Sequence, residues 1–247
     1  MPAAAPGPQS VDRALEILDA VADAARPVSA KALARQLGCS LSTVYHLLGP
    51  LTARGHLLRT AGGYTLGPRV PALYRAFQRH LEIGPGTGEL LRRVQRAAGV
   101  PAYLTAHRDG VITVVDSAGP AGAPEHPFVP GPELRAHATA HGKVLLAPLS
   151  RAARRRYLAA HGMARLTDRT ITGADRFEAE LDRVRDAGVA VSVGEADPAY
   201  TCLAVPLPAP HPDGVTHALS VSLPTSGFRR RQAVLREVVT RAATGRL

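Results

Sequence analysis

The stretch SAKALARQLGCSLSTVYHLLGPLTARGHLLRTAGGYTLG, residues 29–67, decides the fold of the N-terminal part. Ser29 is a good cap for a short helix, and Gly38 suits the left-handed residue that ends one. Only a tight turn separates Gly38 from Ser40 and Ser42, either of which can cap the next helix. The inward stripe of that helix is predicted to be Leu41, Val44, Leu47, Leu48 and Leu51. This pattern predicts a helix-turn-helix.

Two short strands follow the helix pair and predict a wing. Residues 57–60 and 64–66 are strand-like, and Ala61-Gly62-Gly63 has the backbone freedom that a hairpin turn needs. Upstream, apolar residues recur at three- and four-residue spacing after Ser10, a good N-cap, and predict another amphipathic helix. Three helices and a hairpin predict a winged helix-turn-helix over residues 10–70.

The side of the second helix opposite its apolar stripe carries the candidate DNA-reading groups. A helix-turn-helix places such side chains in the major groove, where hydroxyl and imidazole groups can contact phosphates or base edges. Arginines near the wing and on the preceding helix add cations for the phosphate backbone. We predict DNA contacts from Arg35, Ser40, Ser42, Thr43, Tyr45, His46, Arg54 and Arg59. Taken singly, Ser42 can be only a cap and His46 only an exposed helix residue.

The charge of the chain favours an anionic partner without naming it. The 247 residues include 30 Lys and Arg against 20 Asp and Glu, which gives a formal net charge of +10. No acidic residue lies between Asp23 and Glu82. Such a stretch suits duplex DNA, and it equally suits a solvated basic face. The helix pattern favours the first interpretation, so we predict a double-stranded DNA operator as the partner.

Composition predicts a globular, cytoplasmic protein. Hydrophobic residues make up 45% of the chain and charged residues 20%. Residues 1–9 are rich in Ala and Pro, lack the features of a secretory signal, and are predicted to be a disordered tail. Every apolar run is interrupted well short of bilayer length, so we expect no association with a membrane. With only Cys39 and Cys202, far apart, we expect no disulfide framework, and we predict no cofactor.

A domain boundary is predicted after the wing. Pro68 and Pro71 mark its exit, and residues 71–86 are predicted to form a linker helix that ends at a Gly-Pro-Gly break. Residues 87–247 then alternate helical and strand-like patterns. Helices are expected at 89–98, 142–147, 151–160, 175–187 and 230–242, and strands at 102–106, 111–116, 189–193, 202–207 and 217–223. The segment 119–133 contains five prolines and is expected to be an irregular loop. We predict an α+β domain with helices on one side of an antiparallel sheet.

Several motifs carry a resemblance to a known family. In the N-terminal part they are SVDRALEIL (10–18), LSTVYHLL (41–48) and GYTLG (63–67). In the C-terminal part they are HATAHGKVLLA (137–147) and the stretch from Gly188 through Glu195 to CLAVP (202–206). The chain resembles the IclR family of bacterial transcription regulators from Ser10 to about Gly227. The resemblance implies a GAF-like effector-binding domain, dimers or dimers of dimers, and repression or activation of nearby metabolic genes.

Two positions depart from the family pattern. The family usually has Arg where this chain has His46, so the expected DNA contact there is weaker and depends on pH. Pro50 falls inside the predicted DNA-reading helix and cannot donate to the carbonyl of His46, so we expect it to end or kink the helix. The N-terminal end of that helix is unaffected.

The resemblance also implies that four segments meet in a pocket for a small organic acid or aromatic metabolite. Backbone N–H groups ahead of a helix expected to open at Gly142 can hold a carboxylate. Ser220 and Ser222 lie two apart on a strand and face the same way. Ser192 stands where members that bind small oxo-acids tend to carry Asp. The predicted effector contacts are Thr139, Ala140, His141, Gly142, Ser192, Cys202, Ser220 and Ser222.

Other interpretations of these residues stay open. Cys202 can be a small buried hydrophobe, the serines a solvated strand face, and Glu195 either a pocket residue or an exposed carboxylate. His137 and His141 lie four apart and can share a helix face as metal ligands, but no third ligand is evident, so we predict no metal.

The sequence leaves two functions besides ligand-responsive regulation. One is a cysteine-dependent enzyme acting on a small acid, with Cys202 as nucleophile, His137 or His141 as base and the winged helix serving dimerisation. No catalytic signature surrounds Cys202, so we predict no catalytic residues. The other is a winged helix that binds only protein, which the acid-free stretch argues against. We therefore predict a DNA-binding transcription regulator whose operator affinity responds to a small molecule.

Overall fold

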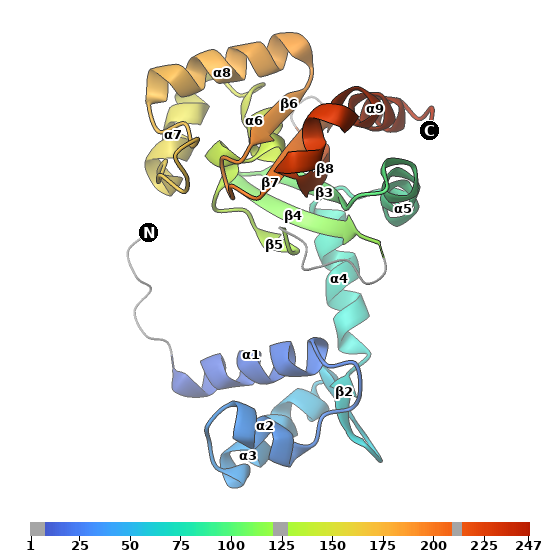
Figure 1. Cartoon of the computed structure of the whole chain (residues 1–247). Helices are drawn as coiled ribbons and strands as arrows, with labels where there is room; N and C mark the ends of the chain where they lie inside the picture. The colour runs from blue at the N-terminus through green and yellow to red at the C-terminus, as the bar shows by residue number, and fades with distance from the viewer. Residues whose placement is uncertain (1–7, 121–127, 209–213) are drawn as a thin grey trace. The chain divides into compact units, whose positions relative to one another are not determined.

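The computed structural model describes residues 8–120, 128–208 and 214–247. The chain divides into two compact units, Met1–His80 and Leu81–Leu247 (Figure 1). Of the predicted N-terminal tail, residues 1–7 lie outside the described residues. Pro8 and Gln9 are described, and Gln9 is already helical.

The first unit is a winged helix-turn-helix, as the sequence predicts. It contains α1 (Gln9–Ala22), α2 (Ala30–Gln36), α3 (Leu41–Ala53), β1 (Leu57–Thr60) and β2 (Gly63–Leu66). Its core unites Ile17, Leu33, Val44, Leu48 and Leu57 from the three helices and the wing. Because α1 begins at Gln9, with Pro8 at the cap position, the prediction that Ser10 caps this helix is wrong.

The two ends of α3 refine the prediction for that helix. The Ser40 hydroxyl, and not that of Ser42, caps it by accepting the N–H of Thr43 at 3.1 Å. The expectation that Pro50 ends the helix is wrong, because α3 continues to Ala53. The turn beyond the proline is held by the Arg54 N–H, which donates to the Pro50 carbonyl at 3.0 Å.

The wing is joined to the segment that precedes α2. Strands β1 and β2 pair antiparallel from Leu57 opposite Leu66 to Thr60 opposite Gly63. Val28 and Tyr64 form a further bridge through two backbone hydrogen bonds of 2.9 and 2.8 Å. Gly63 has a φ of +135°, and a Cβ there would lie 2.4 Å from the Val28 carbonyl oxygen. Only glycine therefore allows this close approach.

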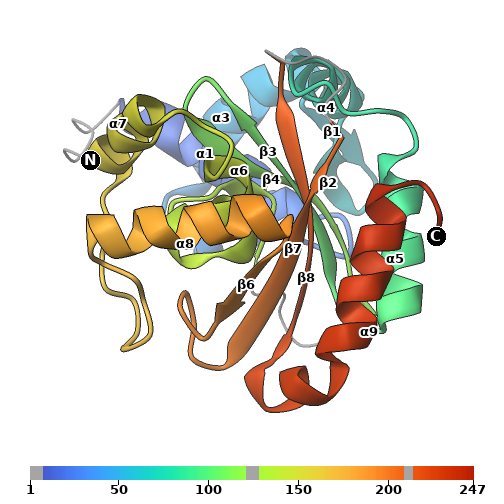
Figure 2. The same cartoon turned by 90° about the horizontal axis from the view of Figure 1, so that it is seen from above.

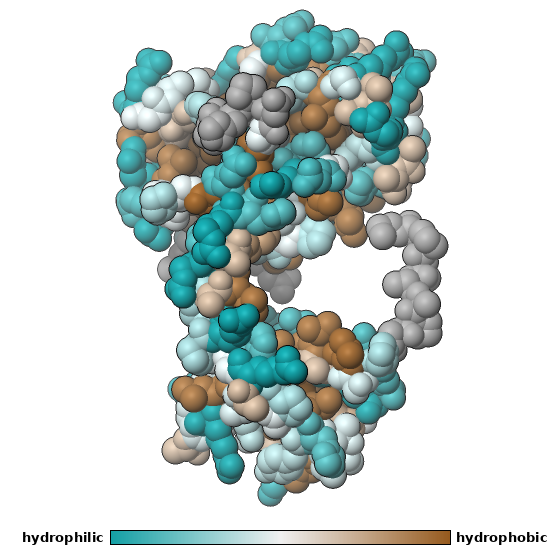
Figure 3. Space-filling model, turned by 180° about the vertical axis from the view of Figure 1, so that it is seen from behind, coloured by the Kyte–Doolittle hydropathy of each residue, from teal (hydrophilic) through white to brown (hydrophobic). Residues whose placement is uncertain are grey.

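Helix α4 (Arg69–His80) follows the wing, so the linker helix predicted for residues 71–86 begins two residues earlier and ends at His80. None of its residues is buried. Val70, Leu73, Tyr74 and Phe77 recur at helical spacing, and the last three are among the exposed large hydrophobic residues. In Figure 3, which is coloured by hydropathy, hydrophobic residues appear in brown at several places on the surface. This helix therefore carries an exposed apolar stripe.

The second unit is built on a six-stranded antiparallel sheet with the order β5-β4-β3-β8-β7-β6. The strands are β3 (Ala102–Arg108), β4 (Val111–Ala118), β5 (Gly131–Pro132), β6 (Ala190–Val193), β7 (Tyr200–Leu207) and β8 (Thr216–Pro224). The helices are α5 (Thr87–Ala98), α6 (Ala140–Leu146), α7 (Arg151–His161), α8 (Ala174–Ala187) and α9 (Thr225–Ala243). Of the segment predicted to be irregular, residues 121–127 lie outside the described residues, and Gly131–Pro132 form β5.

Helices cover both faces of this sheet, which corrects the prediction of a single covered side. Helices α5 and α9 pack on one face, and α6, α7 and α8 lie on the other (Figure 2). The central strands are apolar on both faces: Leu104 and Leu219 point to the first helix layer, and Tyr103 and Ala218 to the second. A sheet that is apolar on both faces must be covered on both to bury them.

Candidate DNA-binding surface and effector pocket

Helix α3 presents a polar side to solvent. Val44 and Leu48 are buried against the rest of the first unit, while Ser42, Tyr45 and His46 are exposed, with 51% of Tyr45 accessible. Leu41, predicted to point inward, is 36% exposed, because it stands at the first position of the helix. The three exposed side chains lie within the first two turns of α3, the part of a recognition helix that reaches base edges.

The remaining predicted DNA contacts occupy different positions. Thr43 is half-buried, and its hydroxyl lies 2.8 Å from that of Ser40, so these two residues form the helix cap. Arg35 on α2, Arg54 after α3 and Arg59 on β1 are all exposed. The structure thus places three arginines and three α3 side chains on the surface of the first unit.

All eight predicted effector residues are buried in the second unit. Ser192, Cys202 and Ser222 stand opposite one another on β6, β7 and β8 and form a row across the sheet. The row lies on the face covered by α6, because Cys202 belongs to the core on that side. The alternative interpretation of the serines as a solvated strand face is therefore wrong.

The fold itself uses several of these eight residues. The Thr139 hydroxyl accepts the Gly142 N–H at 3.2 Å and caps α6, which begins at Ala140 and not at Gly142. The Ser192 hydroxyl donates to the Ala138 carbonyl at 2.6 Å. A Cβ on Gly142 would lie 2.1 Å from the Ala136 carbonyl oxygen, so this glycine permits close packing of α6 on the preceding turn.

His141 is held by a carboxylate that the sequence analysis did not single out. Its Nε2 lies 3.1 Å from Glu133 Oε2, and both side chains are buried. Glu133 also accepts the Arg135 N–H at 2.7 Å. Burial opposes ionisation of Glu133, but the hydrogen bond and charge of His141, together with Arg135, hold the pKa of Glu133 below its usual value. This pair is a buried, hydrogen-bonded anchor at the start of α6.

A pocket of about 300 Å³ adjoins this anchor, lined by Val114, Phe128, Val129, Pro132, Glu133, Leu134 and Arg135. The Phe128 ring packs edge-on against His141, with centroids 4.8 Å apart, and the Arg135 guanidinium carbon lies 5.6 Å from the Phe128 centroid. None of the eight predicted effector residues lines this pocket.

Sequence reasoning missed this pocket because Phe128, Glu133 and Arg135 lie in the proline-rich segment or directly after it. The available signal was the charged pair Glu133 and Arg135 directly before the HATAHG motif.

Two of the predicted effector residues carry a buried polar atom that has no hydrogen-bond partner among the described residues. They are Nδ1 of His141 and the hydroxyl of Ser220. Ser220 stands opposite Tyr103 on the neighbouring strand, and the Tyr103 ring packs edge-on against Phe128 with centroids 5.3 Å apart. A contact series thus connects Ser220 to His141 through two aromatic rings. Buried polar atoms of this kind suit contact with a bound molecule or water.

A buried lysine lies on the other side of α6. Lys143 is fully buried, and its Nζ lies 2.5 Å from Glu195 Oε1 and 3.2 Å from Glu180 Oε1. Glu195 is 8% exposed, so the alternative of an exposed carboxylate is wrong. Burial raises the pKa of Glu195 even though Lys143 favours the ionised form. This ion pair ties α6 to α8 and to the loop after β6.

The groups considered for metal binding and catalysis turn toward other partners. His137 Nε2 lies 3.0 Å from the Ala164 carbonyl oxygen, whereas His141 contacts Glu133. Burial lowers the pKa of His137. The Cys202 thiol donates to the Ser222 hydroxyl at 3.3 Å, and burial raises the pKa of Cys202 to about 12.

No helix in residues 8–120, 128–208 and 214–247 is both long and apolar enough to cross a membrane.

The fold and these sites define a winged-helix protein with a separate α+β domain that encloses polar groups beside a pocket. Residues 10–60 match the IclR helix-turn-helix domain, and residues 77–245 match the bacterial transcriptional regulator IclR C-terminal domain. The chain belongs to the IclR family of bacterial transcription regulators.

Individual relatives and structures agree with this assignment. The glycerol operon regulatory protein of Streptomyces griseus is 31% identical over 213 residues, which cover 81% of this chain and 78% of that protein. The crystal structure of Thermotoga maritima IclR matches with a TM-score of 0.74 at 22% identity, covering 96% of this chain and 98% of that one. An IclR homologue from Microbacterium hydrocarbonoxydans, complexed with 4-hydroxybenzoate, matches with a TM-score of 0.66 at 20% identity, covering 96% and 98%. The two structures share the fold of this chain.

Proposed function

We propose that residues 10–70 bind a double-stranded DNA operator and that α3 enters the major groove. The observation that carries this proposal is the exposed row Ser42, Tyr45 and His46 opposite the buried Val44 and Leu48. Side chains on this row can reach base edges, while nearby cations contact phosphates. The contacts that we propose are Ser42, Tyr45 and His46 for the groove, Arg35, Arg54 and Arg59 for phosphates, and Ser40 and Thr43 for positioning α3.

A fluorescence-anisotropy titration tests this proposal with the full chain. DNA from upstream of its own gene should bind at least a hundredfold more tightly than random duplex at moderate salt. Arg54→Ala should weaken both affinities and reduce their salt dependence, because phosphate contacts release counterions. Arg155→Ala removes an exposed arginine of the second unit and serves as the matched control. Equal affinity for both duplexes would refute operator recognition.

We propose that residues 87–247 form the effector-binding domain, with residues 71–86 as the linker between the two functions. The effector pocket lies beside the buried Glu133 and His141 pair. Arg135 supplies a cation for a carboxylate, and the Phe128 ring supplies an apolar wall. An effector of this site is a small organic acid with an aromatic or short apolar body, and the homologue that binds 4-hydroxybenzoate supports this class.

The eight residues first predicted have different roles in this proposal. His141 and Ser220 offer buried polar atoms toward the ligand. The others support the surrounding structure without lining the pocket: Thr139, Ala140, Gly142, Ser192, Cys202 and Ser222. The effector changes operator affinity by binding one arrangement of the protein better than another.

Calorimetric titration of the full chain with benzoate, 4-hydroxybenzoate and succinate tests the effector site. At least one acid should bind, and the uncharged analogue benzamide should bind at least tenfold more weakly than benzoate if the aromatic acid is preferred. Arg135→Ala should remove this preference, whereas Arg155→Ala should keep it. Binding that is unchanged in Arg135→Ala would refute the assignment of the cation.

We propose that the chain assembles as a homodimer, or as a dimer of dimers, through the apolar stripe of α4. Leu73 and Phe77 lie four residues apart on α4, and both are exposed. The same stripe on two chains is self-complementary about a twofold axis, as a symmetric dimer requires. Light scattering should give a dimer or tetramer for the wild type, and Leu73→Glu should shift it toward smaller species. A monomeric wild type would refute this assembly.

We further propose that the protein acts in the cytoplasm, where its operator lies, and that it catalyses no reaction. The Cys202 thiol is held protonated by its environment and pairs with a serine hydroxyl and not with an imidazole. A nucleophilic thiolate needs the opposite surroundings. Cys202→Ala should therefore retain ligand-dependent DNA binding, and no candidate acid should be turned over by the wild type.

A further inference from the structure

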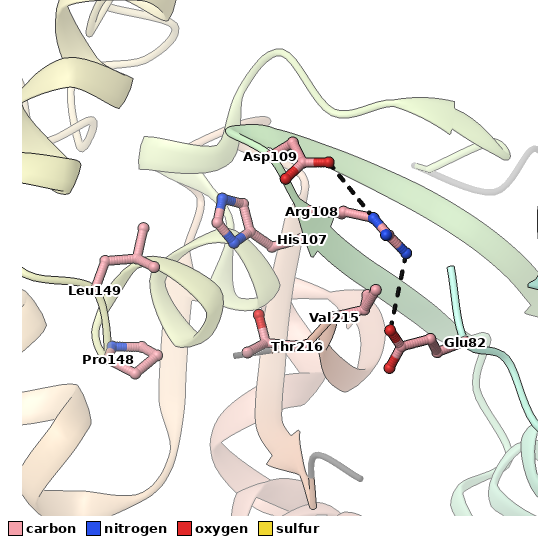
Figure 4. Close-up of a pocket in the computed structure, with 9 residues that line it drawn as sticks. Glu82, His107, Arg108, Asp109, Pro148, Leu149, Val215 and Thr216 are labelled. Carbon is pink, nitrogen blue, oxygen red and sulfur yellow. Dashed lines mark ion pairs between the residues drawn. The ribbon is translucent and has the colours of Figure 1, made fainter. Parts of the chain in front are cut away.

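A second pocket of the C-terminal unit lies at the end of the sheet where β3 turns into β4. It has a volume of about 380 Å³, within the usual range for small-molecule sites. Its polar wall is formed by Glu82, His107, Arg108, Asp109 and Thr216, and Leu149 contributes to an apolar wall (Figure 4). All of these residues belong to the second unit.

Three polar atoms of this wall are buried without a hydrogen-bond partner among the described residues. They are Glu82 Oε2, His107 Nε2 and Thr216 Oγ1. His107 and Thr216 stand opposite each other on β3 and β8, so their side chains lie on the same face of the sheet. Leaving one buried polar atom unsatisfied typically costs about 1–3 kcal/mol. Three such atoms on the wall of one pocket indicate a place where a bound molecule supplies the missing partners.

The charges around the pocket restrict what that molecule can be. Arg108 pairs with two carboxylates: its Nη1 lies 3.8 Å from Glu82 Oε1 and its Nε 3.5 Å from Asp109 Oδ2, as the dashed lines in Figure 4 mark. Burial lowers the pKa of His107, although the Asp109 charge opposes this, so its imidazole is neutral at neutral pH. An anionic ligand would meet the two carboxylates, and a cationic ligand would meet the guanidinium.

The donors and acceptors of the wall point to hydroxyl groups. A carboxylate only accepts hydrogen bonds, a neutral imidazole offers one donor and one acceptor, and a threonine hydroxyl does both. A ligand that satisfies all three must donate and accept at several positions without carrying charge. Several adjacent alcohol groups have this property, and Leu149 and Pro148 can cover the C–H side of such a molecule.

We propose that this pocket binds a neutral polyhydroxylated compound, such as a monosaccharide or sugar alcohol, at a site separate from the effector pocket. The two pockets share no lining residue, and on β3 His107 lies four residues, about 13 Å at the rise of a strand, beyond Tyr103, which stands opposite Ser220. An adjoining hollow of about 450 Å³ shares His107, Asp109 and Leu149 and contains the buried Tyr157 hydroxyl, which also lacks a partner among the described residues. This hollow gives room for five- or six-carbon compounds in preference to glycerol.

Calorimetric titrations of the full chain with a charge series test the proposal. Glucose and ribitol are the neutral probes, gluconate is the anionic probe and glucosamine the cationic one. At least one neutral probe should saturate the protein at millimolar concentration or below, and each charged probe should bind at least tenfold more weakly. If neither neutral probe saturates the protein, or if gluconate binds as well as glucose, the proposal is wrong.

Matched variants locate the site. Thr216→Val and Glu82→Gln should each weaken polyol binding about fivefold or more. Thr216→Val removes a hydroxyl, and Glu82→Gln replaces an accepting oxygen with a donating NH2 group, each at nearly unchanged shape. Thr113→Val on β4, which lines neither pocket, should bind as the wild type does. Ser220→Ala should leave polyol binding unchanged, and a loss in this variant would instead place the polyol in the effector pocket and refute a second site.

A spectroscopic measurement does not depend on the variants folding. In the wild-type chain with 15N-labelled histidine, saturation with the bound polyol should shift the ring signals of His107 more than those of His141. Larger shifts at His141 would contradict the assignment.

Discussion

Helices α3 and α6 both carry motifs of the family, and they place their polar side chains in opposite ways. On α3, Ser42, Tyr45 and His46 are exposed, so they are free to contact a partner and add little to the core. On α6, every residue is buried, including His141 and Lys143, and each of these needs an internal partner. Substitutions on α3 should therefore change DNA binding more than stability. Substitutions on α6 should change stability more than ligand binding.

The largest expected effect compares two glycines. Gly142→Ala should lower the free energy of unfolding of the second unit by about 3 kcal/mol, because the new Cβ would overlap the Ala136 carbonyl. Gly49→Ala in α3 should raise the stability of the first unit by about 0.5–1 kcal/mol, because nothing lies within 4 Å and alanine favours the helix. Urea unfolding followed by circular dichroism measures both. A harmless Gly142→Ala would contradict the close packing of α6.

The second-largest expected effect on stability is at the buried carboxylate of Glu133. Glu133→Gln should lower the stability of the second unit by about 2 kcal/mol at pH 7, because His141 loses its hydrogen bond to a buried carboxylate. The folded-state pKa of Glu133 lies below the ordinary value of about 4.3, so its contribution is present above that pH and is lost as the pH falls through the folded-state pKa. Wild-type stability should therefore fall more steeply below about pH 4 than that of the variant.

The exposed Glu237→Gln on α9 is the control for this pH dependence. It should unfold at the same urea concentration as the wild type at every pH. If Glu133→Gln and the wild type show the same acid dependence, Glu133 does not anchor α6 through its charge.

On α3, His46→Arg should strengthen operator binding about fivefold to tenfold with little change in stability. The new guanidinium adds one phosphate contact and should steepen the slope of log affinity against log salt by about 0.9. Gln232→Arg adds the same charge to the exposed surface of α9 and should leave operator affinity unchanged. An equal gain from both variants would mean that net charge, and not the position on α3, sets the affinity.

The smallest expected effect on stability is at Ser220. Ser220→Ala removes a buried hydroxyl without a partner among the described residues, so stability should stay equal or rise by less than about 1 kcal/mol. The same variant should weaken effector binding about fivefold. Thr139→Ala, which removes the cap of α6, should instead lower stability by about 1 kcal/mol. Thermal unfolding with and without effector distinguishes the two.

The first unit was largely predictable because its helices expose one side and bury the other, and its apolar spacing follows that geometry. Periodicity placed α2, α3 and the wing, and only details such as the cap of α1 and the continuation of α3 past Pro50 were wrong. In the second unit, strand positions were predictable, but the second helix layer was not. The residues of both sheet faces are apolar, and spacing alone does not say which helix covers which face.

The proposed effector site was the least predictable part. Sequence singled out His141 and Ser220, which are both buried, but it gave no means to know that Ser192 donates to Ala138 or that Thr139 caps α6. Glu133 and Phe128 reach the pocket from residues next to a stretch with no periodic pattern. Contacts between segments far apart in the chain are set by tertiary packing, which local spacing does not encode.

The bridge between Val28 and Tyr64 has a practical consequence for redesigning operator preference. The inclination of the hairpin depends on a segment more than thirty residues earlier in the chain, since Gly63 is locked against it. An engineer who grafts a foreign wing must therefore transplant residues 27–29 with it or retain this glycine. Arg59 and Ala61 are exposed, so these two positions can be substituted to change operator preference.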